Sequence, residues 1–320
     1  MATVDIPTDT LSEILRCPVC RCDIESGGDG WLCQNPACAA VFPCVEGVPI
    51  LLNERNSVFD TATFLDKKPT FFKPRGRLRA ALSDCLPSLD CNIAAMRVLR
   101  ELRDRLLAEC DCPKVLVLGG GILGDGMDVL VDHPRITLVE TDVALGPRTQ
   151  LVCDIHDLPF CDGSYDAVIV EAVLEHVVNP RECVDEIERV LKPNGFVYAD
   201  TPFIQQVHGR EYDFTRFTRL GHRRLFRNFT ETDSGISVGP GSALAWSLRY
   251  FMLSFFTSAT GRRLAGGFTR LAFGWLKYFD RFLASRPGSL DAASAFYFLG
   301  RKAGKPIGDR ELLAEYRGGF

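Results

Sequence analysis

Four cysteines near the start of the chain have the spacing of metal ligands. Cys17 and Cys20 form a CxxC pair, and Cys33 and Cys38 form a second pair after twelve intervening residues. Four thiolates arranged as a tetrahedron are the ligands that a structural Zn²⁺ site favours. A segment of about fifty residues buries little core, so a metal would supply much of its stability. The spacing therefore predicts a zinc site at these four residues.

The remaining cysteines indicate a reducing environment. Cys22 and Cys44 lie in the same segment and are spare thiols that could replace a ligand; the alternative is a small cysteine-rich fold without metal. The first residues show neither the basic region nor the apolar run of a secretory leader. We therefore expect the thirteen cysteines to be thiols or metal ligands rather than disulfides, and the protein to be cytoplasmic.

A glycine-rich turn follows the first strongly apolar run of the chain. Val115 to Leu118 lead directly into a GxGxxG pattern at Gly119, Gly121 and Gly124. Such a run is typical of a buried parallel strand, and the glycines allow a tight turn and close approach of backbone to a ligand. With a helix opening at 127–131, this is the first βα turn of a nucleotide-binding fold.

An acidic residue lies at the distance that a ribose site requires. The strand expected at 136–140 ends in Glu140, nineteen residues after Gly121. A carboxylate at that position can accept hydrogen bonds from both hydroxyls of a ribose; the alternative is a solvated strand-end acid. These features fit a nicotinamide-dependent dehydrogenase equally well.

Strands and helices alternate through the rest of this region. We expect strands at 151–154, 167–171 and 196–199, and a helix at 183–191 that the sequence Pro193-Asn194-Gly195 stops. Another amphipathic helix, at 93–109, precedes the glycine strand. Five strand–helix steps predict an α/β fold with a mostly parallel sheet and helices on both faces.

The residues from 114 to 203 resemble class I S-adenosylmethionine-dependent methyltransferases of the small-molecule branch. The resemblance is carried by VLVLGGGILG, by Glu140, by DIHDLPFCDGSYDAVIVEAVLEHV and by RVLKPNGFV. It implies a Rossmann-like sheet of seven mostly parallel strands and S-adenosylmethionine as cofactor. It also implies that the cofactor is held by Gly119, Gly121, Gly124, Glu140, Asp154, Ile155 and Glu171, with Glu140 on the ribose, Asp154 on the adenine amino group and Ile155 on its ring. The family usually has an acid where this chain has Val117.

Two histidines are candidates for the acceptor side. In open α/β sheets ligands bind at the carboxyl ends of the strands. His176 follows the fourth strand, and His208 follows the fifth within TPFIQQVHGREYDFTRFT. Since an oxygen or nitrogen acceptor must lose a proton during methyl transfer, His208 is the leading candidate base and His176 the second. The alternative for both is a structural or loop role.

The cysteine segment resembles the zinc-ribbon family typified by the activator subunit of tRNA methyltransferases. The shared features are CPVC, the Val41-Phe42-Pro43 step and the ending Gly47-Val48-Pro49-Ile50-Leu51, although the second cysteine pair is wider than usual. We divide the chain into a zinc-ribbon-like domain (1–54), a linker with N-terminal helices (55–112), a methyltransferase domain (113–304) and a C-terminal tail (305–320). The linker is locally basic from Lys67 to Arg79.

A helical insertion at about 241–288 precedes the last strand, expected at 294–299. Its first helix (243–256) is apolar and aromatic, and its second (268–283) carries aromatic and basic residues. A cap over the acceptor site is one interpretation. The other is an interfacial element that contacts the inner face of a membrane; the first helix is short for a span of roughly twenty residues.

Composition narrows the function. The chain has 320 residues, 46% of them hydrophobic, a formal charge of −4 and a pI near 5.8. An acidic balance argues against a dedicated nucleic-acid binder. We expect a methyltransferase that acts on an oxygen or nitrogen of a small-molecule or glycan-type acceptor. The alternatives are an RNA methyltransferase with zinc-ribbon recognition and a non-catalytic cofactor-binding scaffold.

Overall fold

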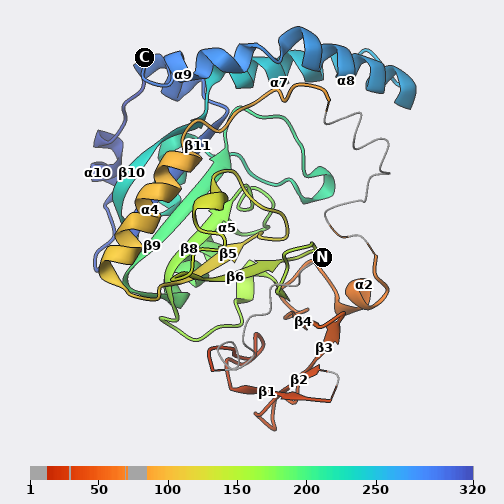
Figure 1. Ribbon diagram of the computed structural model, residues 1–320, viewed down its shortest axis with the longest axis vertical. Coiled ribbons are helices and arrows are strands. Elements are labelled where there is room, and N and C mark those ends of the chain that lie inside the picture. The colour runs from red at the N-terminus through yellow and green to blue at the C-terminus, as the bar shows by residue number, and fades with distance from the viewer. Residues whose placement is uncertain (1–12, 29, 69, 71–84, 320) are drawn as a thin grey trace.

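One mixed sheet of eleven strands organises the molecule (Figure 1). The structure is a computed structural model that describes residues 13–28, 30–68, 70 and 85–319. In spatial order the strands are β1 (Ile24–Gly27), β2 (Gly30–Cys33), β3 (Val41–Val45), β4 (Val48–Leu51), β7 (Leu151–Cys153), β6 (Thr137–Asp142), β5 (Lys114–Leu118), β8 (Tyr165–Glu171), β9 (Leu191–Pro202), β11 (Ala295–Lys302) and β10 (Phe229–Val238). In the middle of the sheet, the strands β4, β7, β6, β5, β8 and β9 are parallel to one another. The pairs on either side, β3 with β4 and β9 with β11, are antiparallel.

The prediction of a seven-stranded sheet is wrong for the sheet as a whole. Seven strands do come from residues 114–302, but the cysteine segment adds four more. The junction is β4, whose Ile50 and Leu51 lie opposite Val152 and Cys153 of β7 in parallel. All four residues are buried, and pairing them covers an edge that would otherwise expose unpaired backbone groups.

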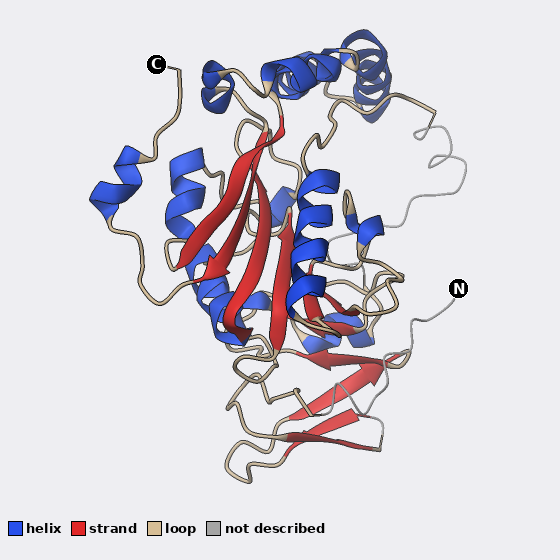
Figure 2. Ribbon diagram, turned by 60° about the vertical axis from the view of Figure 1, so that its left-hand side comes forward, coloured by secondary structure: helices blue, strands red, loops and turns tan. Residues whose placement is uncertain are grey.

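Helices cover both faces of the sheet (Figure 2). On one face α4 (Ala95–Glu109) packs Val98, Leu99 and Leu102 against the core side chains of β5, β8 and β9. On the other, α5 (Pro180–Val190) and α6 (Arg219–Leu225) pack against a second core cluster. The expected helix at 127–131 is only a 3₁₀ turn, η1 (Met127–Val129). Leu130 caps this turn, and Asp132, with a φ of +58°, leaves the helical conformation before Pro134.

The cysteine segment and the larger domain share one hydrophobic core. Trp31 and Phe42 of the segment belong to the same buried cluster as Phe160 and Tyr165. The Arg21 guanidinium donates a 2.6 Å hydrogen bond to the Leu158 carbonyl oxygen. The expected linker is also packed, through the short helix α2 (Thr61–Leu65), which buries Phe64. The basic residues from Lys73 to Arg79 lie outside the described residues.

The helical insertion lies beside the end of the sheet where the parallel strands finish (Figure 1). It comprises α7 (Pro240–Leu253), α8 (Ala259–Phe273), η4 (Leu276–Phe279), α9 (Asp280–Leu283) and η5 (Pro287–Asp291). The expected single helix at 268–283 is therefore interrupted: α8 begins after the cap Ser258 and ends at Gly274. The buried Asp280 carboxylate accepts hydrogen bonds from the Gly241 and Ser242 backbone and thus anchors α7. No helix among the described residues has the length and apolar character needed to cross a membrane.

The C-terminal tail contains one further helix, α10 (Asp309–Ala314). It packs against α6, where the Arg223 guanidinium lies 3.2 Å from the Glu315 carboxylate. The tail is therefore part of the folded domain rather than a polar extension.

Candidate active site

A cavity of about 780 Å³ opens at the carboxyl ends of β5, β6, β8 and β9. Its lining includes Gly119 after β5, Asp142 at the end of β6, Glu171 at the end of β8 and Asp200 near the end of β9. The chain runs from β5 outward to β7 and then returns to β8 on the other side of β5. Such a switch point is where open α/β sheets bind their ligands.

The glycine turn packs closely against side chains at and just after the end of β8. Gly119 has a φ of +78°, and a Cβ built on it would lie 2.4 Å from Cγ2 of Val173. A Cβ on Gly124 would lie 2.0 Å from the Glu171 carboxylate. Both glycines line the cavity, and their contact with a cofactor stays a prediction. Gly121 lies behind the lining, where its N–H donates a 2.9 Å hydrogen bond to Asp142.

Two acids of β6 reach the cavity, and the sequence identified only one. Glu140 lines the cavity and is nearly fully buried, and its two oxygens accept hydrogen bonds of 2.8 and 2.7 Å from Arg148. Asp142 lies two residues further on, so it projects from the same face, and burial raises the pKa of its carboxyl to about 6. Sequence reasoning missed it because the strand is expected to end at Glu140, whereas β6 continues to Asp142.

Asp154 and Ile155, the two residues predicted to contact adenine, lie differently relative to the cavity. Ile155 lines the cavity, and its contact with the ring stays a prediction. The Asp154 carboxylate caps η2 (Ile155–Asp157) and accepts hydrogen bonds from the Ser57 hydroxyl at 2.6 Å and the His156 backbone at 3.0 Å. Burial opposes ionisation, but these bonds and the His156 ring outweigh it, so the Asp154 pKa is lowered. In this structure Asp154 binds Ser57 of the 53–57 segment and does not line the cavity.

Three carboxyl groups face one another where β8 and β9 end. Glu171, Asp200 and Asp125 all line the cavity. Burial, then Asp200 and Asp125, raises the pKa of Glu171 to about 9, and burial raises that of Asp200 to about 7. Glu171 also has an oxygen, Oε1, that is buried without a hydrogen bond to any described residue. Such a group of acids favours a ligand that carries positive charge.

The two predicted histidines lie together beside the cavity. Their rings are 4.8 Å apart, edge to face, and both Nε2 atoms approach the Glu175 carboxylate, at 3.7 Å for His176 and 3.6 Å for His208. Glu175 and His176 line the cavity. Burial lowers the pKa of His176; burial also opposes charge on His208, but Glu175 and Asp213 outweigh it and raise the His208 pKa. The sequence did not indicate that Glu175 would join them.

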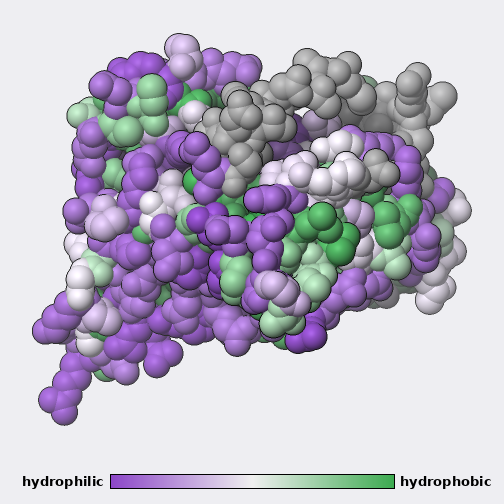
Figure 3. All heavy atoms as spheres, turned by 90° about the horizontal axis from the view of Figure 1, so that it is seen from below, coloured by the Kyte–Doolittle hydropathy of each residue, from purple (hydrophilic) through white to green (hydrophobic). Residues whose placement is uncertain are grey.

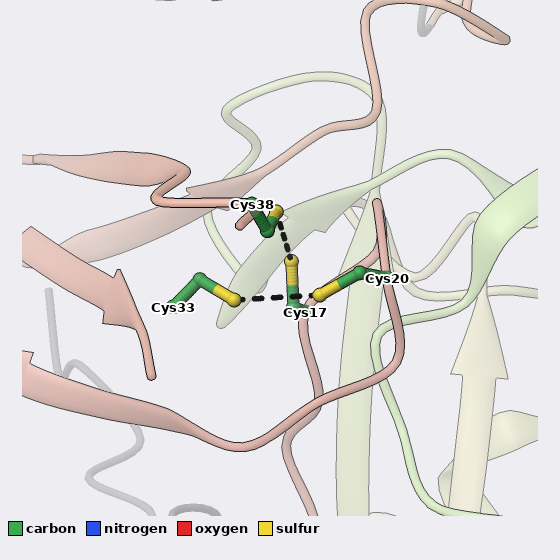
Figure 4. Close-up of side chains that lie close together, drawn as sticks. All are labelled: Cys17, Cys20, Cys33 and Cys38. Atoms are coloured by element: carbon green, nitrogen blue, oxygen red, sulfur yellow. Dashed lines mark hydrogen bonds between the residues drawn. The ribbon is translucent and has the colours of Figure 1, made fainter. Parts of the chain in front are cut away.

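The four cysteines of the ribbon converge as their spacing predicts (Figure 4). All four sulfur atoms lie within 4.8 Å of one another, with Cys17 and Cys38 3.8 Å apart and Cys20 and Cys33 3.4 Å apart. Ligands of a tetrahedral zinc with Zn–S bonds of about 2.3 Å are separated by roughly 3.8 Å. Cys22 is exposed and lies outside the cluster.

Comparison with known proteins shows what part of this chain is similar to. Residues 133–199 match the family model described as a methyltransferase domain. A demethylmenaquinone methyltransferase from Clavibacter sepedonicus is 33% identical over 177 residues, which are 53% of this chain and 66% of that protein. An uncharacterized 37.1 kDa protein in transposon TN4556 of Streptomyces fradiae is 43% identical over 93 residues, 28% of this chain and 25% of that protein. The chain thus spans less than two thirds of the length of either curated relative.

Among solved structures, the chain is similar to a phosphoethanolamine N-methyltransferase 2 from Haemonchus contortus in complex with S-adenosyl-L-methionine. The TM-score is 0.40 at 14% identity, over 63% of this chain and 52% of that one. The resemblance of the ribbon to the activator family stays a prediction.

Proposed function

We propose that this chain, which carries a class I S-adenosylmethionine-dependent methyltransferase domain, transfers a methyl group to an oxygen or nitrogen of a small-molecule or glycan-type acceptor. The observation that supports this most is the acidic cavity beside the glycine turn, next to residues that match the methyltransferase family. The curated relative from Clavibacter is named for a small-molecule acceptor, demethylmenaquinone.

The charge of the cavity suits S-adenosylmethionine. When bound, this cofactor supplies a methyl group that its sulfonium has already activated. Its sulfonium and its α-ammonium group are both positive, and beside them the carboxyl groups of Glu171, Asp125 and Asp200 would ionise and supply the matching negative charge. The buried, unbonded Oε1 of Glu171 would gain a partner there. These acids thereby replace the acid that the family usually has at the position of Val117.

The residues of this chain would contribute mainly by aligning the cofactor with the acceptor, and less by taking part in bond making themselves. Glu140 or Asp142 would hold the ribose, Ile155 would contact the adenine, and Glu175, His176 and His208 would face the acceptor from the other side. Fixing nucleophile, methyl carbon and sulfur in line supplies much of the rate enhancement of such a displacement.

The ribose assignment gives the test of the cofactor site. We expect Glu140→Ala to weaken S-adenosylmethionine binding by about 1–3 kcal/mol in calorimetry, because buried partners of the carboxylate are left unsatisfied. Glu101→Ala on α4, away from the cavity, is the control. If Glu140→Ala binds normally and Asp142→Asn does not, the ribose role belongs to Asp142. Wild-type protein that neither binds the cofactor nor forms S-adenosylhomocysteine with cell extract would rule out the proposed function.

We further propose that the insertion contacts the surface of an anionic membrane. Residues 240–279 contain five Arg or Lys and no Asp or Glu, in a chain whose net charge is −4. One face of α8 exposes Leu264, Phe268 and Leu271, and Trp275 continues it. The opposite end of the molecule is mostly hydrophilic, with a few small apolar areas (Figure 3). Aromatic apolar faces with basic flanks suit an interfacial position.

Vesicle binding tests this contact. We expect the protein to sediment with phosphatidylcholine vesicles that contain phosphatidylglycerol, and much less with phosphatidylcholine alone. Leu264→Glu combined with Leu271→Glu should weaken binding at least about tenfold, since burying one leucine contributes roughly 1.5–3 kcal/mol. Leu313→Glu on α10 is the matched control, because Leu313 is as exposed (69%) as Leu264 (72%) but belongs to another surface. Equal loss in both proteins would argue against a membrane role for the insertion.

A further inference from the structure

We propose that Glu175, His176 and His208 bind a divalent transition-metal ion of the Zn²⁺ type on the acceptor side of the cavity. Their ligand atoms lie within 4.8 Å of one another. The distances from the Glu175 oxygen to the two Nε2 atoms, 3.6 and 3.7 Å, exceed those of hydrogen bonds. They are close to the roughly 3.3 Å between two ligands of a tetrahedral ion with bonds of about 2.0–2.1 Å.

Glu175 is the residue that most requires a cation. Its side chain is fully buried, and both of its oxygens lack a hydrogen bond to any described residue. A buried carboxylate is costly unless a charge or a metal compensates it, and the groups that the described structure places beside the Glu175 oxygens are the two imidazoles. Glu175 follows the end of β8. Its backbone carbonyl oxygen accepts hydrogen bonds from the backbone N–H groups of Phe214 and Thr215, which fix this part of the chain. The carboxylate is therefore held in place although no described hydrogen bond explains its position.

The two imidazoles are oriented as metal ligands are. Nδ1 of His176 lies 2.9 Å from the Tyr212 carbonyl oxygen, and because a carbonyl only accepts, Nδ1 carries the proton. The neutral ring then directs the lone pair of Nε2 toward the Glu175 oxygen. Nδ1 of His208 lies 3.4 Å from both the Gln206 carbonyl oxygen and the Arg216 guanidinium, and 3.7 Å from the Asp213 carboxylate. The Tyr212 carbonyl thus fixes the tautomer of His176 as in metal-binding histidines, whereas the groups behind His208 hold the orientation of its ring.

Asp213 is itself held in place. Its carboxylate accepts the backbone N–H groups of His208 at 2.7 Å and Gly209 at 3.0 Å, and it pairs with Arg216. The backbone of the loop that carries His208 is therefore fixed by hydrogen bonds to Asp213, the same carboxylate that lies beside the His208 ring. Two imidazoles and one carboxylate suit Zn²⁺, Fe²⁺ or Co²⁺, whereas Mg²⁺ and Ca²⁺ prefer oxygen ligands.

An ion in this position would act on the acceptor. Glu175 and His176 line the cavity, so the open coordination position would face the acceptor space. An acceptor hydroxyl bound there would lose its proton to solvent near neutral pH, as zinc-bound water does. Its oxygen would then form the bond to the methyl carbon while the carbon–sulfur bond breaks and its electron pair returns to sulfur, leaving S-adenosylhomocysteine. This step rests on the proposed function and specifies a hydroxyl compound as acceptor.

Titration with Co²⁺ alone tests the site on the full chain as purified, with the ribbon metal in place. Cobalt bound by nitrogen and oxygen gives weak visible bands, whereas cobalt bound by thiolates adds intense sulfur charge-transfer bands. We expect one equivalent to bind with nitrogen–oxygen bands, and Glu175→Gln and His208→Ala each to weaken binding at least a hundredfold. His133→Ala is the control, since His133 lies before β6, outside the three-residue cluster.

The outcomes separate the two proposals. Wild-type protein without the nitrogen–oxygen cobalt spectrum, or variants that bind cobalt normally, would overturn the metal site. Glu175→Gln keeps the shape of the side chain, and a thermal unfolding profile like that of the wild type would show that lost binding is not lost folding. If cobalt binds as expected and S-adenosylmethionine does not, the metal site stands and the methyltransferase proposal fails.

Discussion

Cys17→Ser should release one equivalent of metal per chain and unfold the ribbon. Binding of a structural zinc contributes about 10–16 kcal/mol in small zinc modules, so losing one thiolate removes most of what holds the segment together. Cys17 is fully buried and lies 3.8 Å from Cys38, its partner across the cluster. Elemental analysis and thermal unfolding of the purified variant are the measurements.

The loss should extend beyond the ribbon, because the ribbon is not an independent module. Its Trp31 and Phe42 share a core cluster with the larger domain, and β4 pairs with β7. We therefore expect a lower Tm for the entire chain. Cys22→Ser is the matched control, since Cys22 is exposed and outside the cluster, and it should keep its zinc and its Tm. A Cys17→Ser protein with unchanged metal content would refute the four-cysteine assignment.

Glu171→Gln should stabilise the cofactor-free protein above neutral pH and weaken its binding of S-adenosylmethionine. Burial raises the pKa of Glu171 from its ordinary value of 4.5 to about 9. Between these values the native state keeps a proton that the unfolded chain releases, so raising the pH from about 5 to about 9 lowers the free energy of unfolding. Glutamine removes this contribution. A gain of about 1–3 kcal/mol is expected, because keeping that proton costs about 1.4 kcal/mol for each pH unit above the ordinary pKa.

The measurement is the Tm from pH 5 to 9 with and without the cofactor. Asp200 and Asp142, with pKa values raised by burial to about 7 and about 6, add slope of the same sign and remain in the variant. The slope should therefore become shallower without vanishing. Glu25→Gln, a change of the same type at an exposed position of β1, should leave the slope as it is. Equal slopes in wild type and Glu171→Gln would mean that Glu171 is ionised in the native protein.

Local sequence signals predict the parts of the fold that local chemistry determines. The strands β5, β6, β8 and β9 carry buried apolar runs, and the cysteine pairs have metal-ligand spacing, so the amino-acid sequence alone is enough to place both. The pairing of β4 with β7 is different, because a parallel edge contact leaves no pattern in either strand. The 3₁₀ turn after the glycine loop is followed by left-handed backbone at Asp132, which the apolar pattern of this short segment does not show.

The candidate site divides in the same way. Glycines, Glu140 and the histidines follow strand ends and can be identified by position. Glu175 cannot, since its importance comes from His208, more than thirty residues further on, folding back beside His176. Asp154 is expected at the adenine, but it lies outside the cavity lining, and its carboxylate is bonded to His156 and to Ser57 of the packed 53–57 segment. Side-chain partners of this kind depend on tertiary packing and leave no periodic signal.

The pairing of β4 with β7 has a consequence for the order in which the chain is made. Ile50 lies opposite Val152, about a hundred residues later in the sequence. At a synthesis rate of about 5–20 residues per second, β4 leaves the ribosome roughly 5–20 s before its partner exists. During that interval the apolar edge of β4 is available to other nascent chains or to chaperones. Zinc binding by the four cysteines before β7 is synthesised would fold the ribbon early. The zinc concentration during translation should therefore influence the fraction of this protein that aggregates.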